Sequence, residues 1–70
     1  MKIIGERLLA LRKQNGLKQT QAAEALELSI SAYCRYEYGQ REPTAPVLIR
    51  MADLYGVTID YLVGRTEERN

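Results

Sequence analysis

The segment from Gln19 to Gly39, QTQAAEALELSISAYCRYEYG, is the most informative part of the sequence. It predicts one short helix over residues 20–26, because its apolar residues fall on one side of a helical wheel. These inner residues are Ala22, Ala23 and Leu26. It predicts a second helix over residues 30–38, which the hydroxyl of Ser29 can cap and Gly39 ends. The connection between the two is so short that the helices must cross at a steep angle.

The second of these helices has two chemically different faces. At about 100° per residue, Tyr33, Tyr36 and Glu37 fall on one side, with Ile30 at its edge. The other side holds small, hydrogen-bonding or cationic residues and one tyrosine, namely Ser31, Arg35 and Tyr38, flanked by Ala32 and Cys34. An aromatic face suits packing on a core, whereas a small cationic face suits insertion into a groove of nucleic acid. We therefore interpret residues 30–38 as the recognition helix of a helix-turn-helix motif.

The N-terminal segment predicts a helix over residues 3–14. An apolar stripe recurs there at helical spacing, and Asn15–Gly16 supplies a left-handed stop. The stripe is made of Ile4, Leu8 and Leu11. The cationic side chains of this segment are expected on its solvated side, as charges that favour solubility; they are Lys2, Arg7 and Lys13.

The last third of the chain predicts two more helices. One follows Thr44, which can cap it, and closes at Gly56; Pro46 is tolerated because it lies in the first turn. The other follows Thr58 and stops at Gly64. The sequence therefore predicts an all-α fold with five helices. We expect one domain over residues 1–64 and a short polar tail, residues 65–70, that frays.

Composition excludes several classes of protein. Seventy residues form one small domain with a thin core. One cysteine and no histidine exclude a disulfide framework and the usual zinc ligand sets within a single chain. No apolar run approaches membrane-spanning length, and charge comes too early for a signal peptide. Because the lone Cys34 also fits a reducing compartment, we expect a soluble, cytoplasmic protein without membrane contact.

The distribution of charge along the chain is more informative about possible partners than the net charge of +1. Residues 1–41 contain seven cations and four acids, whereas residues 42–70 contain three cations and five acids. The half with the recognition helix is therefore the basic half. This asymmetry modestly favours contact with nucleic acid.

Many short motifs stand in the order and spacing of a known family. They are Ile4-Gly5-Glu6-Arg7, Leu11-Arg12, Gly16-Leu17, Gln19, Tyr36-Glu37, Gly39, Arg41-Glu42-Pro43, Ala52 and Val57-Thr58-Ile59-Asp60-Tyr61-Leu62. From Ile4 to Gly64 the chain resembles the Cro/phage-repressor, or XRE-type, helix-turn-helix proteins. The resemblance implies a compact, lambda-repressor-like, five-helix DNA-binding domain. It implies a small transcriptional regulator, a repressor, that binds a palindromic operator as a homodimer with half-sites about 34 Å apart.

The resemblance also implies roles for individual residues. The residues expected to contact base edges are Ile30, Ser31, Ala32 and Arg35, and the guanidinium of Arg35 can bind guanine bidentately. The residues expected to contact phosphates are Gln19, Thr20, Ser29, Tyr38, Gln40 and Arg41. Similar proteins pair an arginine and a glutamate at the positions of Arg12 and Glu37, so we interpret this pair as structural. Glu37 lies on the inner face, where an unpaired charge would be costly.

Four positions depart from the family pattern. The turn carries Glu27 where glycine is usual, so its backbone either is not left-handed or bears strain. Tyr33 and Tyr36 replace aliphatic residues, and each hydroxyl needs a partner or solvent. Tyr38 stands where a small polar residue is more usual; it either stacks on sugar or phosphate or is simply exposed.

Two questions concern partners. We expect a homodimer through the last helix, because its apolar surface exceeds what a thin core can cover; the candidate contacts are Ile59, Tyr61 and Val63. The alternative to a DNA-binding regulator is a protein-interaction module, such as an antitoxin or partner-docking domain. A near-neutral charge and five tyrosines favour that alternative, since tyrosine is enriched at interfaces. A third and weaker alternative is that the chain is one domain of a longer protein.

An enzyme is not expected. The sequence has no histidine, no cluster of metal ligands and no glycine-rich phosphate loop. Cys34 has neither a histidine nor a second cysteine to activate it, so we interpret it as a redox-inert thiol. No cofactor is expected either.

Overall fold

The structure, a computed structural model, describes all residues 1–70 and contains five helices and no strand. The helices are α1 (Lys2–Gln14), α2 (Gln19–Ala25), α3 (Ile30–Glu37), α4 (Ala45–Tyr55) and α5 (Ile59–Leu62). The predicted all-α, five-helix fold is therefore confirmed. Boundaries differ from the prediction by one residue: α1 and α2 each begin one residue early, and α3 ends at Glu37 with Tyr38 as its C-cap.

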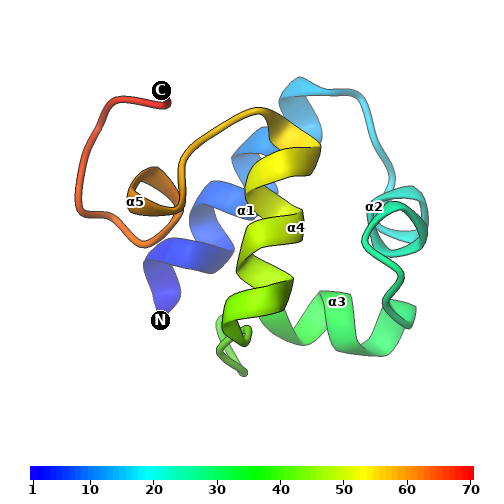
Figure 1. The fold of residues 1–70 in the computed structure, drawn as a ribbon. Helices are drawn as coiled ribbons and strands as arrows, with labels where there is room; N and C mark the ends of the chain where they lie inside the picture. The colour runs from blue at the N-terminus through cyan, green and yellow to red at the C-terminus, as the bar shows by residue number, and fades with distance from the viewer.

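Helix α1 connects the two sides of the molecule. Figure 1 shows α4 crossing in front of α1, with α2 and α3 to one side and α5 with the C-terminal residues to the other. Helix α3 packs against both α2 and α1, and α5 packs against α1 and α4. The buried apolar residues between them are Ile4, Leu8, Leu11, Ala22, Ala23, Leu26, Tyr33, Tyr36, Met51, Ala52, Tyr61 and Leu62. The predicted inner apolar residues of the first three helices belong to this core, except Ile30 at the edge of its face, which is 43% exposed. The predicted inner Glu37 is buried but is not part of the apolar core.

The turn between α2 and α3 is tightly bonded and includes one strained residue. Leu28 N donates to Ala23 O at 2.9 Å, and Ser29 Oγ accepts from the backbone N–H of Ala32 at 3.1 Å, as predicted for the cap. Glu27 has a φ of 58°, in the left-handed region that favours glycine. The backbone is thus left-handed at Glu27, at a cost of roughly 1 kcal/mol for a residue with a Cβ.

Only one of the two C-terminal helices is capped by its threonine side chain. Thr58 Oγ1 accepts from the backbone N–H of Tyr61 at 3.0 Å. Thr44 is the N-cap of α4 by position, but its hydroxyl makes no cap hydrogen bond, so that prediction was wrong. Pro46 gives a physical reason, because it removes one of the first-turn N–H donors that a cap would bind.

Helices α1 and α3 cross very closely at Gly5, which is buried. A Cβ at this position would lie 2.9 Å from the carbonyl oxygen of Tyr36 and closer still to that of Glu37. Both oxygens are backbone atoms at the C-terminal end of α3, and backbone atoms cannot move aside as the end of a flexible side chain can. Glycine is therefore required at residue 5 for α3 to lie where it does.

Arg7 is not on the solvated side of α1, which corrects the sequence-based expectation. Its side chain is 11% exposed, and its Nη1 donates to the carbonyl oxygens of Tyr61 and Thr66, each at 2.7 Å. Its guanidinium also lies over the ring of Tyr61, 4.0 Å from the centroid. The last carbonyls of a helix lack intrahelical partners, and a guanidinium can satisfy more than one acceptor at once. Arg7 thus attaches the C-terminal residues to α1.

The C-terminal residues contact α5, contrary to the expectation that they fray. Thr58 N donates to Arg69 O at 2.9 Å, and the guanidinium of Arg69 lies 5.5 Å from the ring centroid of Tyr61. With Arg7 and Arg69 both against its ring, Tyr61 is only 8% exposed. Tyr61 is therefore poorly placed as a dimer contact, whereas Ile59 is 38% exposed. The third candidate, Val63, is half-buried.

We expect Gly5→Ala to lower the free energy of unfolding by about 1–3 kcal/mol, because the added methyl group overpacks the crossing of α1 and α3. The loss should occur although alanine is the better helix former. Urea unfolding followed by circular dichroism measures it. Glu6→Ala, at the exposed neighbouring residue, is the control and should change stability by less than about 0.5 kcal/mol. A Gly5→Ala variant as stable as wild type would contradict the close crossing.

Candidate nucleic-acid interface

The outer face of α3 is open to solvent. Ser31 and Arg35 are exposed, Ile30 is 43% exposed and Ala32 is half-buried. A hollow of about 190 Å³ lies on this face and is lined by Ser29, Ser31, Ala32, Arg35 and Arg41. Three of the four predicted base-contacting residues thus border one hollow, with an arginine from beyond the end of the helix.

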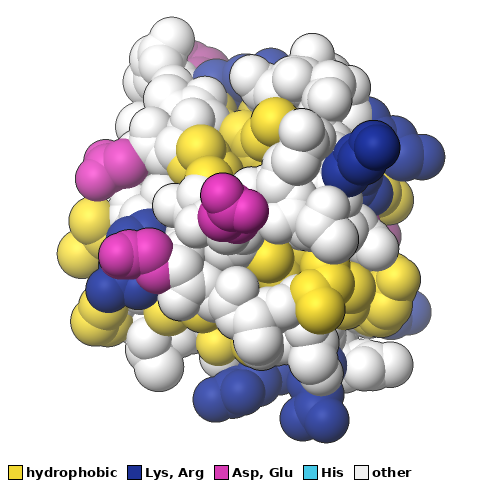
Figure 2. All heavy atoms as spheres, turned by 90° about the vertical axis from the view of Figure 1, so that its right-hand side faces the viewer, with side chains coloured by type: hydrophobic (Ala, Val, Ile, Leu, Met, Phe, Trp, Pro, Cys, Tyr) yellow, Lys and Arg dark blue, Asp and Glu magenta, His cyan; other side chains and the backbone are white.

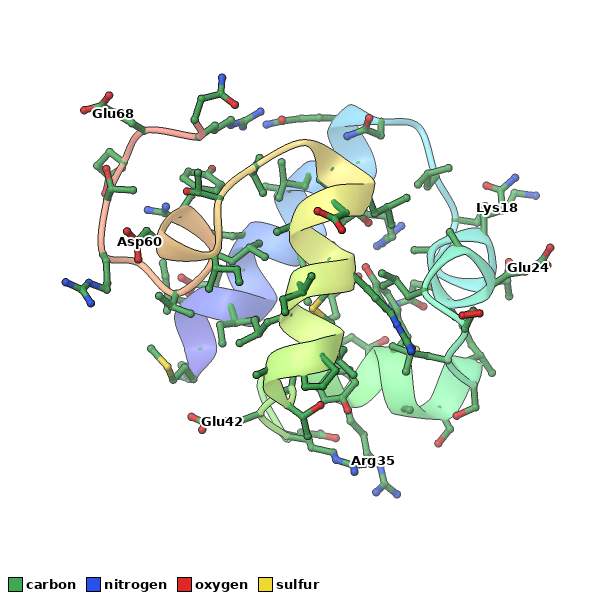
Figure 3. The ribbon with its side chains drawn as sticks, in the orientation of Figure 1. Lys18, Glu24, Arg35, Glu42, Asp60 and Glu68 are labelled. Atoms are coloured by element: carbon green, nitrogen blue, oxygen red, sulfur yellow. The ribbon has the colours of Figure 1, made fainter.

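The cations at this face have no acidic partner within the protein. Figure 3 shows Arg35 extending away from the domain below α3. In Figure 2, Lys and Arg side chains project at the lower edge, whereas the acidic side chains lie higher. No salt bridge involves Arg35 or Arg41. Of the seven cations in residues 1–41, Arg7 and Arg12 are used internally, so fewer are free than the sequence suggested.

The inner face of α3 is buried as the helical wheel predicted. Tyr33 is fully buried, and Tyr36 is 4% exposed. The hydroxyl of Tyr33 makes no hydrogen bond, and neither does the buried hydroxyl of Tyr55 on α4. Burial raises the pKa of both phenols, and the negative charge of Glu37 raises it further, so both stay neutral. Arg41 lies over the ring of Tyr36, 5.7 Å from its centroid, and so connects this face to the hollow.

Arg12 and Glu37 form a bidentate ion pair beneath α3. Arg12 Nε donates to Glu37 Oε2, and Arg12 Nη2 donates to Glu37 Oε1, both at 2.9 Å. Arg12 Nη1 donates to the carbonyl oxygen of Leu17 at 3.0 Å. The carboxylate side chain is 1% exposed and the guanidinium 13%. The pair therefore joins α1, the loop before α2, and the C-terminal end of α3.

The surroundings of Glu37 determine its protonation. Burial by itself would raise the pKa of this carboxyl group, because it disfavours the charged form. Hydrogen bonds from Arg12 and Gln19, together with the charge of Arg12, outweigh burial and hold the pKa below its ordinary value. Glu37 is therefore ionised at neutral pH.

The predicted phosphate-contacting residues fall into two groups. Thr20, Tyr38, Gln40 and Arg41 are exposed. Gln19 and Ser29 already have internal partners: Gln19 Nε2 donates to Glu37 Oε1 at 3.2 Å and to Tyr38 Oη at 3.3 Å, and Ser29 Oγ caps α3. The bond between Gln19 and Tyr38 was not foreseen, since no periodicity relates residues nineteen positions apart.

Comparison with known proteins identifies the family. A family model described as "Helix-turn-helix" matches residues 8–62, which include the whole of α2 and α3. This chain belongs to the helix-turn-helix family. The resemblance to phage repressors and XRE-type regulators inferred from its motifs is confirmed, as is the lambda-repressor-like fold class.

Several relatives of this helix-turn-helix domain are regulators by name. It is 36% identical to the HTH-type transcriptional regulator ImmR of Bacillus subtilis, over 91% of this chain and 50% of that protein. It is 39% identical to the cryptic phage CTXphi transcriptional repressor RstR of Vibrio cholerae, over 89% of this chain and 55% of the relative. Identity to the HTH-type transcriptional regulator AnsR of Bacillus subtilis is 36%, over 91% and 55% of the two chains.

The helix-turn-helix chain spans about half the length of these curated relatives. A comparison with solved structures found no match. No helix has the length and apolar character needed to cross a membrane. No group of three or more residues of the metal-binding types lies close enough to hold an ion.

We expect the stability that the ion pair contributes to depend on pH. Because the pKa of Glu37 is lowered in the folded state, this contribution is complete above the ordinary value of 4.5 and is lost as the pH falls through the folded-state pKa. Glu37→Gln should lower the free energy of unfolding at pH 7 by about 3–5 kcal/mol, since it leaves the Arg12 charge unpaired. Its stability should also decline less on acidification. Thermal unfolding between pH 3 and pH 7 measures both effects.

Glu24→Gln, on the exposed face of α2, is the matched control and should behave as wild type. If Glu37→Gln does not fold, the double variant Arg12→Met/Glu37→Met should, because two apolar residues leave no charge behind. A single variant as stable as wild type at pH 7 would show that the pair is not structural.

Proposed function

We propose that this domain binds double-stranded DNA in a sequence-specific way and acts as a small transcriptional repressor. The proposal rests mainly on one observation: at the outer face of α3, Arg35 and Arg41 border a polar hollow and have no acidic partner. Small side chains beside an unpaired guanidinium let a helix enter the major groove, which is wide enough to admit it. The names of the relatives support a regulatory role.

The proposed base contacts come from one side of α3. Arg35 is exposed and can bind a guanine through its O6 and N7 atoms, Ser31 can serve either a base or a phosphate, and Ala32 can contact a thymine methyl group. Ile30 adds an exposed apolar side chain at the start of the helix. The proposed phosphate contacts on either side are Thr20, Ser29, Tyr38, Gln40 and Arg41.

We also propose that the domain binds a palindromic operator as a homodimer. Its extents are 28 × 23 × 19 Å, so two domains side by side can place their α3 helices near the spacing of about 34 Å between half-sites. One α3 alone would read too few base pairs for useful specificity. Ile59 is the exposed candidate contact, with the half-buried Val63 on the same short segment.

The tyrosines no longer favour a partner-docking module. Their high number suggested an interface, but Tyr33, Tyr36 and Tyr61 are buried and Tyr55 is half-buried. Only Tyr38, at 61%, is widely exposed. Because Tyr38 lies at the end of α3, it belongs to the proposed DNA-binding face and offers little to a separate protein partner.

We expect wild-type protein to enrich a palindromic sequence from a pool of random duplexes and Arg35→Ala to lose that enrichment. Loss of one bidentate contact should reduce discrimination at its base pair by about 1–3 kcal/mol. The selection is run at two salt concentrations, with circular dichroism to confirm folding. Arg65→Ala, an exposed arginine beyond α5, removes the same charge and should leave the selected sequence unchanged. No enrichment by wild type at either salt concentration would reject the proposed function.

We expect the protein to occupy the selected duplex as two copies. Sedimentation of the complex over a series of protein concentrations gives the stoichiometry. Ile59→Lys should weaken binding of the second copy, because it places a charge in the proposed contact, whereas Ile49→Lys, on the exposed side of α4, should not. A single copy bound at saturation would overturn the homodimer.

A further inference from the structure

One polar contact links the start of α2 to the end of α3 on the proposed DNA-binding side. Tyr38 is 61% exposed, and its hydroxyl oxygen accepts a hydrogen bond from Gln19 Nε2 at 3.3 Å. The same nitrogen donates to Glu37 Oε1 at 3.2 Å. A half-buried amide therefore lies between a buried carboxylate and an exposed phenol.

This arrangement leaves the Gln19 side chain without a donor for DNA. A side-chain amide has two N–H donors, and both are used here. Its remaining polar atom, the carbonyl oxygen, is an acceptor and so repels a phosphate. Turning the amide outward would deprive the buried Glu37 carboxylate of a hydrogen bond, which is costly. The amide of Gln19 therefore bonds to groups within the protein and has no N–H left for DNA.

The same arrangement leaves Tyr38 with a directed donor. A phenol hydroxyl has one proton and can accept as well as donate. Because Gln19 occupies an acceptor position of this oxygen, the proton is directed away from Gln19 and is free for another acceptor. The backbone of Tyr38 is held as the C-cap of α3, with its N–H donating to Cys34 O at 2.9 Å. The phenol therefore offers one O–H donor, and the backbone of the residue that carries it is held in place by α3.

On the basis of the DNA binding proposed above, we propose that the hydroxyl of Tyr38 donates a hydrogen bond to a DNA phosphate. Gln19 is then a positioning residue, which orients Tyr38 and does not itself contact the phosphate. The proposal assigns the phosphate contact expected of Tyr38 to its hydroxyl, and it replaces the phosphate contact expected of Gln19 by a positioning role. It also gives a function to the tyrosine that departs from the family pattern, and it makes the hydroxyl, not the ring, the part that matters.

The first test compares Tyr38→Phe with wild type on two probes, the duplex recovered by selection and a mixed-sequence duplex. A hydrogen bond to a charged group is worth enough that the dissociation constant should rise about tenfold or more on both probes. The dependence of affinity on salt should not change, since no charge is removed, whereas Arg41→Gln should reduce its slope by about 1. Tyr55→Phe, which removes a buried phenol hydroxyl from α4, is the control for the substitution itself.

The second test separates positioning from direct contact. Gln19→Met should weaken binding in the wild-type background and have little further effect when Tyr38 is already phenylalanine, because the two changes remove one contact. A merely structural loss would weaken binding equally in both backgrounds, and so would a direct contact from Gln19. Replacing single phosphates of the selected duplex by neutral methylphosphonates should then reveal one position that matters to wild type and not to Tyr38→Phe.

The outcomes separate this inference from the proposed function. If wild type binds and enriches a duplex but Tyr38→Phe binds equally well, the hydroxyl is not a phosphate donor and the exposed ring at most stacks on the sugar. If Gln19→Met costs the same in both backgrounds, Gln19 is not a positioning residue. If wild type binds no duplex, the proposed function fails and this inference fails with it.

Discussion

The ion pair of Arg12 and Glu37 is the interaction that holds the proposed DNA-binding side of the molecule together. Three donors, two from Arg12 and one from Gln19, converge on one carboxylate that is almost fully buried. They come from α1 and from the first residue of α2, while the carboxylate is on α3. The pair therefore determines how α3 is rotated about its axis, and with it which residues face outward. Since a buried pair adds little net stability over an apolar one, its contribution here is orientation.

Local sequence signals predicted most of the fold because they depend on near neighbours. The apolar stripe of α1, the cap at Ser29 and the wheel of α3 each involve residues within a few positions of one another, and each is found as predicted. Even the burial of Glu37 followed from its angular position on the helix. Such signals fix the helices and their inner faces, and the short turn between α2 and α3 then leaves little freedom in how the two cross.

The errors concern contacts between residues distant in sequence. Arg7 has its partners 54 and 59 residues away, and periodicity alone placed it with the solvated charges. The role of Gly5 depends on the carbonyl groups at the end of another helix, so the sequence showed a helical glycine without showing why. The phosphate contact of Gln19 stays a prediction from the resemblance, but its hydrogen bond to Tyr38 was not foreseen, because the family pattern does not include a tyrosine at residue 38.

The attachment of the C-terminal residues by Arg7 has a consequence for larger assemblies. It directs the chain end to the side of the molecule opposite α2 and α3, as Figure 1 shows. A fluorescent label or a fused protein joined after Asn70 would therefore start far from the outer face of α3 and leave it unobstructed. The C-terminus and the proposed DNA-binding face therefore lie on opposite sides of the domain.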